Sequence, residues 1–219
     1  DLRANLNGDQ PQSTLLNIPS NATAGVMTSR AGAKAFFYLG TNRAMFRFTL
    51  MNHMCNDLEQ VHDTKLAPDW IRQDVSRSPG GDSRLFLNNC IGCHNGMDPL
   101  AGAYAYYNYN ETTGRLEYTP GSVQPKYFNN DLNFPQGFRT VDDSWENRWR
   151  EGQNAYLGFD PSLPGSGNGA KSLGQELGNS EAFASRLDRG WVPPTLDDLD
   201  ATELARERSA RLLLIHDEC

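Results

Sequence analysis

The sequence is poor in cysteine and histidine, with four of each among 219 residues, and it contains no long apolar run. Its mean hydropathy is −0.62, and no stretch approaches the roughly 20 apolar residues of a membrane-spanning helix. We therefore do not expect an integral membrane protein. A second C-x-x-C pair is also missing, which argues against a zinc site built from two such pairs. The glycine-rich stretch at 161–169 is not followed by G-K-S/T, so it does not predict a phosphate-binding loop.

Basic residues are outnumbered in this chain, because 27 Asp and Glu stand against 20 Lys and Arg. The formal net charge of −7 disfavours nucleic acid as a partner, since phosphates attract cations. An acidic surface favours a basic redox partner through electrostatic steering. The same charge would also serve solubility alone, so charge by itself does not identify a partner.

Two of the four cysteines stand in Cys90-Ile91-Gly92-Cys93-His94, the C-x-x-C-H pattern of covalent c-type haem attachment. Two thiols separated by two residues can reach the two vinyl groups of one porphyrin from a single helical turn. The histidine that follows can ligate the iron as the proximal ligand. The pattern therefore predicts one haem c. Zinc, disulfide and thioredoxin-like redox chemistry are the alternatives, but the second ligand pair or strand context that they need is missing.

The motif continues as Asn95-Gly96-Met97-Asp98-Pro99-Leu100, and with it the sequence resembles the c-type cytochromes. The resemblance is to bacterial planctomycete-type haem domains with C-x-x-C-H-x-x-(aliphatic)-D-P-L, with Met97 in the aliphatic position. Residues 24–28 and 42–55 resemble the helical region before the motif in those proteins. The resemblance spans about half the chain and implies a cytochrome c-like haem domain.

Haem attachment to C-x-x-C-H in bacteria takes place outside the cytoplasmic membrane. The resemblance therefore implies an exported bacterial protein that is periplasmic or extracellular. The sequence begins with a polar segment, residues 1–5, without an apolar signal core. We expect that a signal peptide has been removed or lies outside the given sequence.

The expected fold is mainly α: a cytochrome c-like helical haem domain with a small β-hairpin insertion and long irregular loops. A polar N-terminal arm (1–22) precedes a single haem-binding domain (23–219). That domain divides into a haem core (41–107), a β and loop insertion (108–140) and C-terminal helices (141–219).

Local patterns predict the individual elements. Apolar spacing predicts a helix from Thr41 to about Val61, and turn residues at 110–114 predict a hairpin. Gly96 is expected to end the helix that carries the haem motif, and Asp98-Pro99 to open the next helix. The four-residue spacing of Trp145 and Trp149 predicts a short helix at 142–150, and further helices are expected at 170–187 and 195–215.

The sixth iron ligand is not evident from the motif. Small cytochromes c take a methionine well after C-x-x-C-H, but no methionine follows Met97, which itself lies on the same side of the ring as His94. We therefore expect a ligand from upstream, among Met27, Met45, Met51, His53, Met54 and His62. His53 and Met54, on the helix from Thr41, are the leading candidates for the distal ligand. Met51 is a weaker one, and an open distal site is the alternative.

Haem attachment would consume Cys90 and Cys93 and leave Cys55 and Cys219 as the other two thiols. Because disulfides persist outside the cytoplasm, we expect a Cys55–Cys219 disulfide that holds the C-terminal helix. The alternative is a buried, reduced Cys55 that acts as a small apolar side chain.

Three functions are compatible with these patterns, and none assigns a catalytic residue. The favoured one is an electron-transfer protein that carries single electrons between redox partners. The second is a haem c enzyme, a peroxidase or oxidase subunit, in which Arg43 and Arg47 could assist at an open distal side. The third is a haem-bearing assembly or interaction module of an oligomer or larger redox complex, because electron carriage alone needs far fewer residues.

Overall fold

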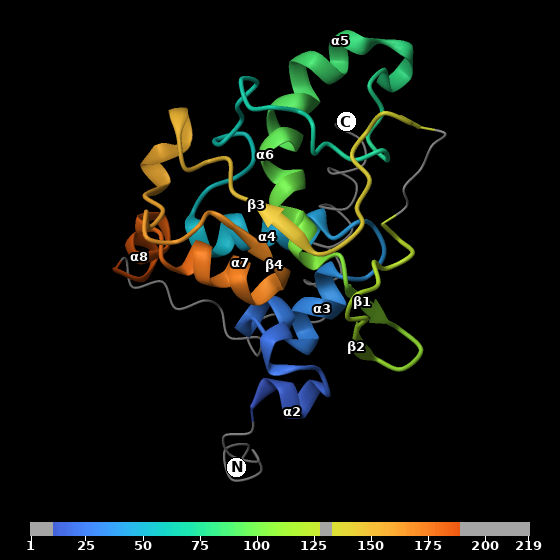
Figure 1. The fold of residues 1–219 in the computed structure, drawn as a ribbon, viewed down its shortest axis with the longest axis vertical. Coiled ribbons are helices and arrows are strands. Elements are labelled where there is room, and N and C mark those ends of the chain that lie inside the picture. Colours follow the sequence, from blue (N-terminus) through green and yellow to red (C-terminus); the bar gives the residue numbers. More distant parts are fainter. Residues whose placement is uncertain (1–10, 128–132, 189–219) are drawn as a thin grey trace.

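The computed structural model describes residues 11–127 and 133–188 (Figure 1). The α-helices of this part are α2 (Gln12–Leu16), α3 (Arg30–Phe36), α4 (Arg43–Met54), α5 (Ser83–Leu85), α6 (Ile91–Ala101), α7 (Gly169–Gly178) and α8 (Glu181–Asp188). The strands are β1 (Tyr107–Asn110), β2 (Arg115–Tyr118), β3 (Ser144–Glu146) and β4 (Ser166–Asn168). In Figure 1 α6 passes through the centre of the view, and the β1–β2 hairpin lies at one edge.

The expectation of a mainly α, cytochrome c-like fold is wrong. The described residues form a mixed fold, in which short helices are combined with two separate two-stranded antiparallel sheets. The second sheet, β3–β4, was missed because its first strand lies where a helix was expected. Trp145 pairs with Gly167, and its indole Nε1 donates to Ser172 Oγ at 2.8 Å. These contacts with residues more than 20 positions away override the helical spacing of the tryptophans.

The predicted hairpin is confirmed. Strand β1 pairs with β2 in the register Tyr107↔Tyr118 to Asn110↔Arg115. Gly114 takes a φ of +62° in the connecting turn, a conformation that favours glycine. Its carbonyl accepts a hydrogen bond of 2.9 Å from Arg30 Nε, which ties the hairpin to α3.

Helix α4 is shorter than predicted, because it ends at Met54 instead of about Val61. Cys55 adopts a left-handed conformation with φ 54°, and both Cys55 and Asn56 donate their backbone N–H to Leu50 O. These two hydrogen bonds to one carbonyl, together with the left-handed conformation of Cys55, end the helix. Val61 is nevertheless buried, so the apolar pattern identified a core residue but assigned it to the wrong element.

Helix α6 continues through Gly96 and Pro99, where an interruption was predicted. Gly96 does not end the helix but allows a close contact with another side chain. A Cβ atom at this position would lie 2.1 Å from the indole Nε1 of Trp149. The tryptophan in turn lies 5.7 Å from the ring of Phe46 on α4, measured between ring centroids. Gly96 therefore lets one tryptophan pack between α4 and α6.

The main core joins segments from both halves of the chain. It combines α4 and α6 with the hairpin, with Trp145 and Trp149, and with Leu173 and Leu177 of α7. Ile18 and Ala22 also belong to this core, so residues 11–22, expected as a polar arm, are partly packed. The C-terminal half of α6, with Met97, Leu100 and Ala101, is therefore packed in a core that residues from 18 to 177 complete together.

The C-terminal region differs from the single helix predicted at 170–187. Helices α7 and α8 are separated at Asn179 and Ser180, where Ser180 Oγ accepts from the backbone N–H of Phe183 at 3.2 Å and starts α8. The helix predicted at 195–215 and the residues His216 and Cys219 lie outside the described residues. None of the helices in 11–127 and 133–188 has the length and apolar character needed to cross a bilayer.

Candidate functional site

The C-x-x-C-H residues lie at the start of α6. Cys90 ends a π-helical turn, Phe86–Cys90, and Ile91 begins the α-helix that carries Cys93 and His94. Residues three and four positions apart share one face of a helix. Cys93 and His94 are therefore each neighbours of Cys90 across one turn at the start of α6. The π-turn is an irregularity of a kind that is frequent at functional sites.

The two thiols have different surroundings. Cys90 is 1% exposed and packs with Ile71, Val75 and Phe86 in a small apolar cluster apart from the main core. Cys93 is half-buried, and its thiol donates to the carbonyl of Leu58 at 3.7 Å.

The environment of Cys93 also determines its reactivity. Burial, reinforced by the negative charges of Glu59 and Asp57, raises the pKa of the Cys93 thiol to about 11. Reactive redox thiols have lowered pKa values, because the thiolate is the nucleophile. This environment therefore argues against a thioredoxin-like dithiol at this position.

The imidazole of His94 is held by a buried carboxylate. His94 is 7% exposed, and its Nδ1 lies 3.1 Å from Oδ1 of Asp98, one helical turn further on. An ionised carboxylate only accepts hydrogen bonds, so Nδ1 carries the proton and donates it. The lone pair is then on Nε2, the nitrogen with which a histidine in this tautomer binds a metal.

Asp98 is in turn held by Arg43 of α4. Its two oxygens accept from Arg43 Nε at 2.7 Å and Nη2 at 2.9 Å, and Oδ2 also accepts from the backbone N–H of Arg72 at 3.2 Å. Arg43 donates with Nη1 and Nη2 to a second carboxylate, Asp74, at 2.7 and 2.9 Å. One arginine thus bridges two carboxylates, and only one of them contacts His94.

Both carboxylates are ionised despite their burial. Burial opposes ionisation of Asp98, but the charge of Arg43 outweighs it and holds the pKa well below its usual range. Burial also opposes ionisation of Asp74, but the charges of Arg43 and Arg72 outweigh it and lower the pKa to about 2. The chain Arg43–Asp98–His94 is therefore a set of charge-assisted hydrogen bonds, which are stronger than neutral ones.

Gly92, the second spacer of the motif, packs directly against His62. A Cβ atom at residue 92 would lie 2.2 Å from Nε2 of His62, so no side chain fits there while the ring keeps this position. The backbone N–H of Asp63 donates to the carbonyl of Gly92 at 3.0 Å and fixes the same segment. The small size of this spacer therefore accommodates an imidazole in the described fold.

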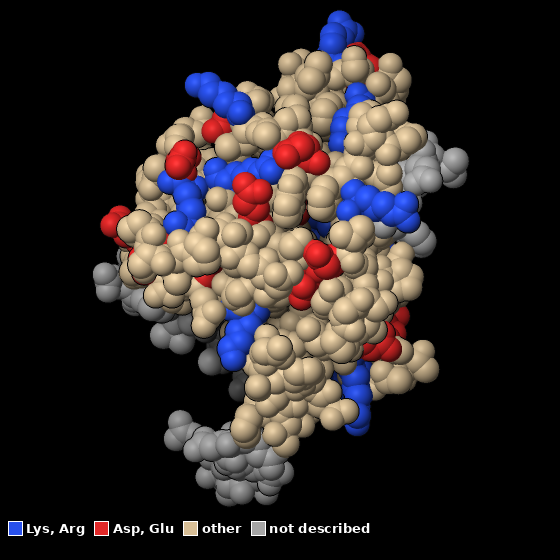
Figure 2. Space-filling model, viewed as in Figure 1, with Lys and Arg blue, Asp and Glu red and all other residues tan. Residues whose placement is uncertain are grey.

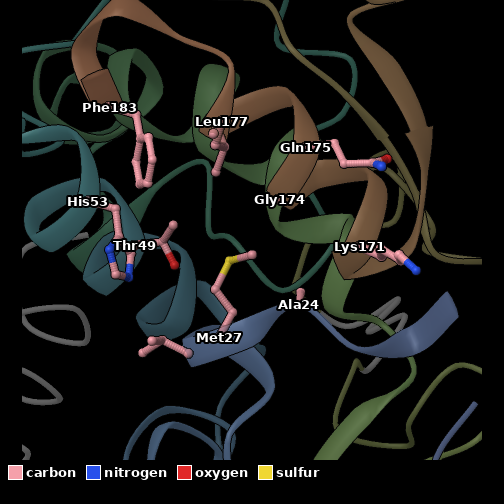
Figure 3. Close-up of a pocket in the computed structure, with 11 residues that line it drawn as sticks. Ala24, Met27, Thr49, His53, Lys171, Gly174, Gln175, Leu177 and Phe183 are labelled. Atoms are coloured by element: carbon pink, nitrogen blue, oxygen red, sulfur yellow. The ribbon is translucent and has the colours of Figure 1, made fainter. Parts of the chain in front are cut away.

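The distal-ligand candidates on α4 point to different places. Met54 is 1% exposed and belongs to the main core, whereas Met51 is half-buried. His53 lines a largely apolar cavity of about 320 Å³, together with Thr49 of the same helix and Phe183 of α8 (Figure 3). None of the C-x-x-C-H residues lines this cavity. The three distal assignments therefore stay predictions.

The described residues do not test the disulfide prediction either. Cys55 is half-buried and lies at the left-handed end of α4. Its predicted partner Cys219 is outside the described residues. The Cys55–Cys219 bridge therefore stays a prediction.

The residue types at the start of α6 are those that a haem c group needs. Two thiols and one imidazole lie together there, and a buried carboxylate fixes one imidazole nitrogen, an arrangement common behind metal-bound histidines. Within 11–127 and 133–188 no group of three or more His, Cys, Asp or Glu is arranged to hold a bare metal ion.

Sequence reasoning missed the role of the residues around His94. Asp98 was noted as a motif position and as a helix cap, and Arg43 as a possible aid to peroxide chemistry. The four-residue spacing of His94 and Asp98 could have indicated their contact, because such residues are neighbours on a helix. No sequence signal pointed to Arg43 as the partner of Asp98. Comparisons with protein-family models, curated proteins and solved structures found no match for this chain.

Proposed function

We propose that this chain is an exported monohaem c-type cytochrome that carries single electrons between redox partners. The observation that supports it best is the spacing of Cys90, Cys93 and His94 at the start of α6, with His94 held by Asp98 at 3.1 Å. When bound, haem c supplies a one-electron iron couple.

The residues of the chain would divide the work of holding this group. Cys90 and Cys93 would form the two thioethers, and His94 would bind the iron through Nε2. The apolar neighbours of Cys90, among them Ile71 and Phe86, would keep water from one side of the attachment point. His53 or Met54, and less favourably Met51, would supply the distal ligand.

Electron transfer needs a surface that a partner can reach and leave. On the face shown in Figure 2, acidic and basic side chains are interspersed and do not gather into a field of one sign. The net charge of −7 supports a basic redox partner, and a periplasmic or extracellular location follows from the haem chemistry. An oligomer or a larger redox complex is compatible with the same proposal.

Both arginines that the enzyme alternative would use are engaged in ion pairs. Arg43 is engaged by Asp74 and Asp98, each at 2.7 Å. Arg47 makes a bidentate pair with Asp57 at 2.7 and 2.8 Å. Neither guanidinium is therefore available to assist peroxide chemistry without breaking an ion pair.

Covalent haem is the first property to test. The full chain, expressed with a haem-attachment system, should retain haem-stained peroxidase activity on a denaturing gel. The variant with Cys90→Ala and Cys93→Ala should lose the stain. Cys55→Ala is the matched control, since it removes a cysteine outside the motif and should keep the stain. Haem that acid acetone extracts from the wild-type chain would contradict the proposal.

A further inference from the structure

We propose that Asp98, held by the fork of Arg43, is a positioning residue for His94 that fixes its tautomer and strengthens its Nε2 as an iron ligand. This inference rests on the proposed function for its consequence at the iron. Its geometric basis is independent of haem, because it lies in contacts within the chain itself.

The first step is the direction of the hydrogen bond. The side chain of Asp98 is fully buried, and its Oδ1 accepts from His94 Nδ1 at 3.1 Å. With the proton on Nδ1, Nε2 keeps its lone pair and points away from Asp98 across the ring. A carboxylate in this position also pushes electron density into the imidazole and raises the basicity of the other nitrogen.

The second step is the rigidity of the carboxylate. Arg43 donates Nε and Nη2 to the two oxygens of Asp98, which fixes the plane of the carboxyl group. The arginine itself is held by Asp74, and its Nη1 also donates to Thr41 Oγ1 at 2.9 Å. Helix α4 thereby sets the orientation of a side chain on α6, which in turn sets the ring of His94.

The third step is a comparison within the same cluster, because Asp74 serves as a control for Asp98. Asp74 carries the same charge and binds the same arginine, but its hydrogen bonds go to Arg43 and not to His94. Loss of the Asp74 charge changes the field around the site without touching the imidazole. Comparison of the two aspartates therefore separates a positioning role from general electrostatics.

The test at the iron compares Asp98→Asn with Asp74→Asn in the haem-loaded full chain. Asp98→Asn should shift the midpoint reduction potential upward, because the weaker ligand and the lost negative charge both stabilise ferric iron less. Asp74→Asn should give a clearly smaller upward shift. Equal shifts in the two variants would overturn the proposal, because they would reflect charge alone.

A second measurement covers the case in which Asp98→Asn does not load haem or does not fold. Nitrogen-15 NMR of the histidine side chains, in full chain prepared without a haem-attachment system and at alkaline pH, reports the tautomer directly. His94 should carry its proton on Nδ1 in the wild type and in Asp74→Asn. Arg43→Lys, which keeps the charge but loses the fork, should give a mixture. A wild-type His94 with its proton on Nε2 would overturn the proposal.

These outcomes distinguish the inference from the proposed function. A wild-type chain that never binds haem covalently contradicts the function, yet the NMR measurement still decides what Asp98 does to His94. A haem-loaded protein with equal potential shifts in the two aspartate variants contradicts the inference and leaves the function standing.

Discussion

Asp98 shows how much of the site depends on single side chains. It is a fully buried carboxylate that accepts from His94, Arg43 and a backbone N–H. Burying a charge is costly unless it is paired and hydrogen-bonded, and here both conditions are met. Removal of Arg43 alone would leave two buried carboxylates without their main partner, and protonation of either carboxylate would break its ion pair with Arg43.

The free energy of unfolding should fall in acid because of Asp74 and Asp98. The pKa of folded Asp74 is about 2, against an ordinary value of 3.8. Between these values the unfolded chain binds more protons than the folded one, so stability decreases as pH falls. The stabilisation is present above about pH 4 and is lost through pH 2. Urea unfolding across this range should show a shallower pH slope for Asp74→Asn, and identical slopes would contradict the prediction.

At the scale of elements, the contact between α6 and Trp149 requires a residue without a side chain at position 96. A Cβ at residue 96 would meet the indole at 2.1 Å, and Trp149 is fully buried between α4 and α6. We predict that Gly96→Ala destabilises the fold by about 1–3 kcal/mol, the range for overpacking a core. Chemical denaturation measures this loss.

The matched control for Gly96 is Gly178, at the end of α7. A Cβ there has no neighbour within 4 Å, so alanine meets no clash. Gly178→Ala should be neutral or stabilising by about 0.4–1 kcal/mol, because it reduces the freedom of the unfolded chain. Equal destabilisation by both substitutions would show that helical glycine, and not the contact with Trp149, is what matters.

Helix α4 is the element from which we predict the distal iron ligand. In the haem-loaded protein, either His53→Ala or Met54→Leu should convert a low-spin absorption spectrum to high spin. Leucine keeps the volume of the buried Met54, so this change removes the sulfur with little repacking. Met51→Leu tests the weaker candidate in the same way. Three variants that all keep the low-spin wild-type spectrum would place the ligand elsewhere.

Elements fixed by local chemistry were predictable, and elements fixed by distant partners were not. The hairpin follows from the turn at 110–114, and the helical haem motif follows from its own spacing. Strand β3 depends on Gly167 and Ser172, so local tryptophan spacing predicted a helix in error. Likewise, C-x-x-C-H predicts three donors, but only the folded chain brings Arg43 to Asp98 across 55 residues.

For the whole molecule, the main core decides what can fold alone. Residues 41–107, the expected haem core, bury their apolar face against Trp145, Trp149, Leu173 and Leu177. We predict that a 41–107 fragment shows no cooperative thermal unfolding by near-ultraviolet circular dichroism, whereas the full chain does. A sharp transition in the fragment would show that the haem segment is an independent unit.

The burial of Cys90 sets an order of events during biosynthesis under the proposed function. In the closed fold Cys90 is 1% exposed and packed by Phe86 and Ile71, which precede it in the chain. A porphyrin therefore has to reach this thiol before this small cluster closes over it. Folding therefore limits the time in which haem can be attached, and a chain that folds before attachment would remain without haem.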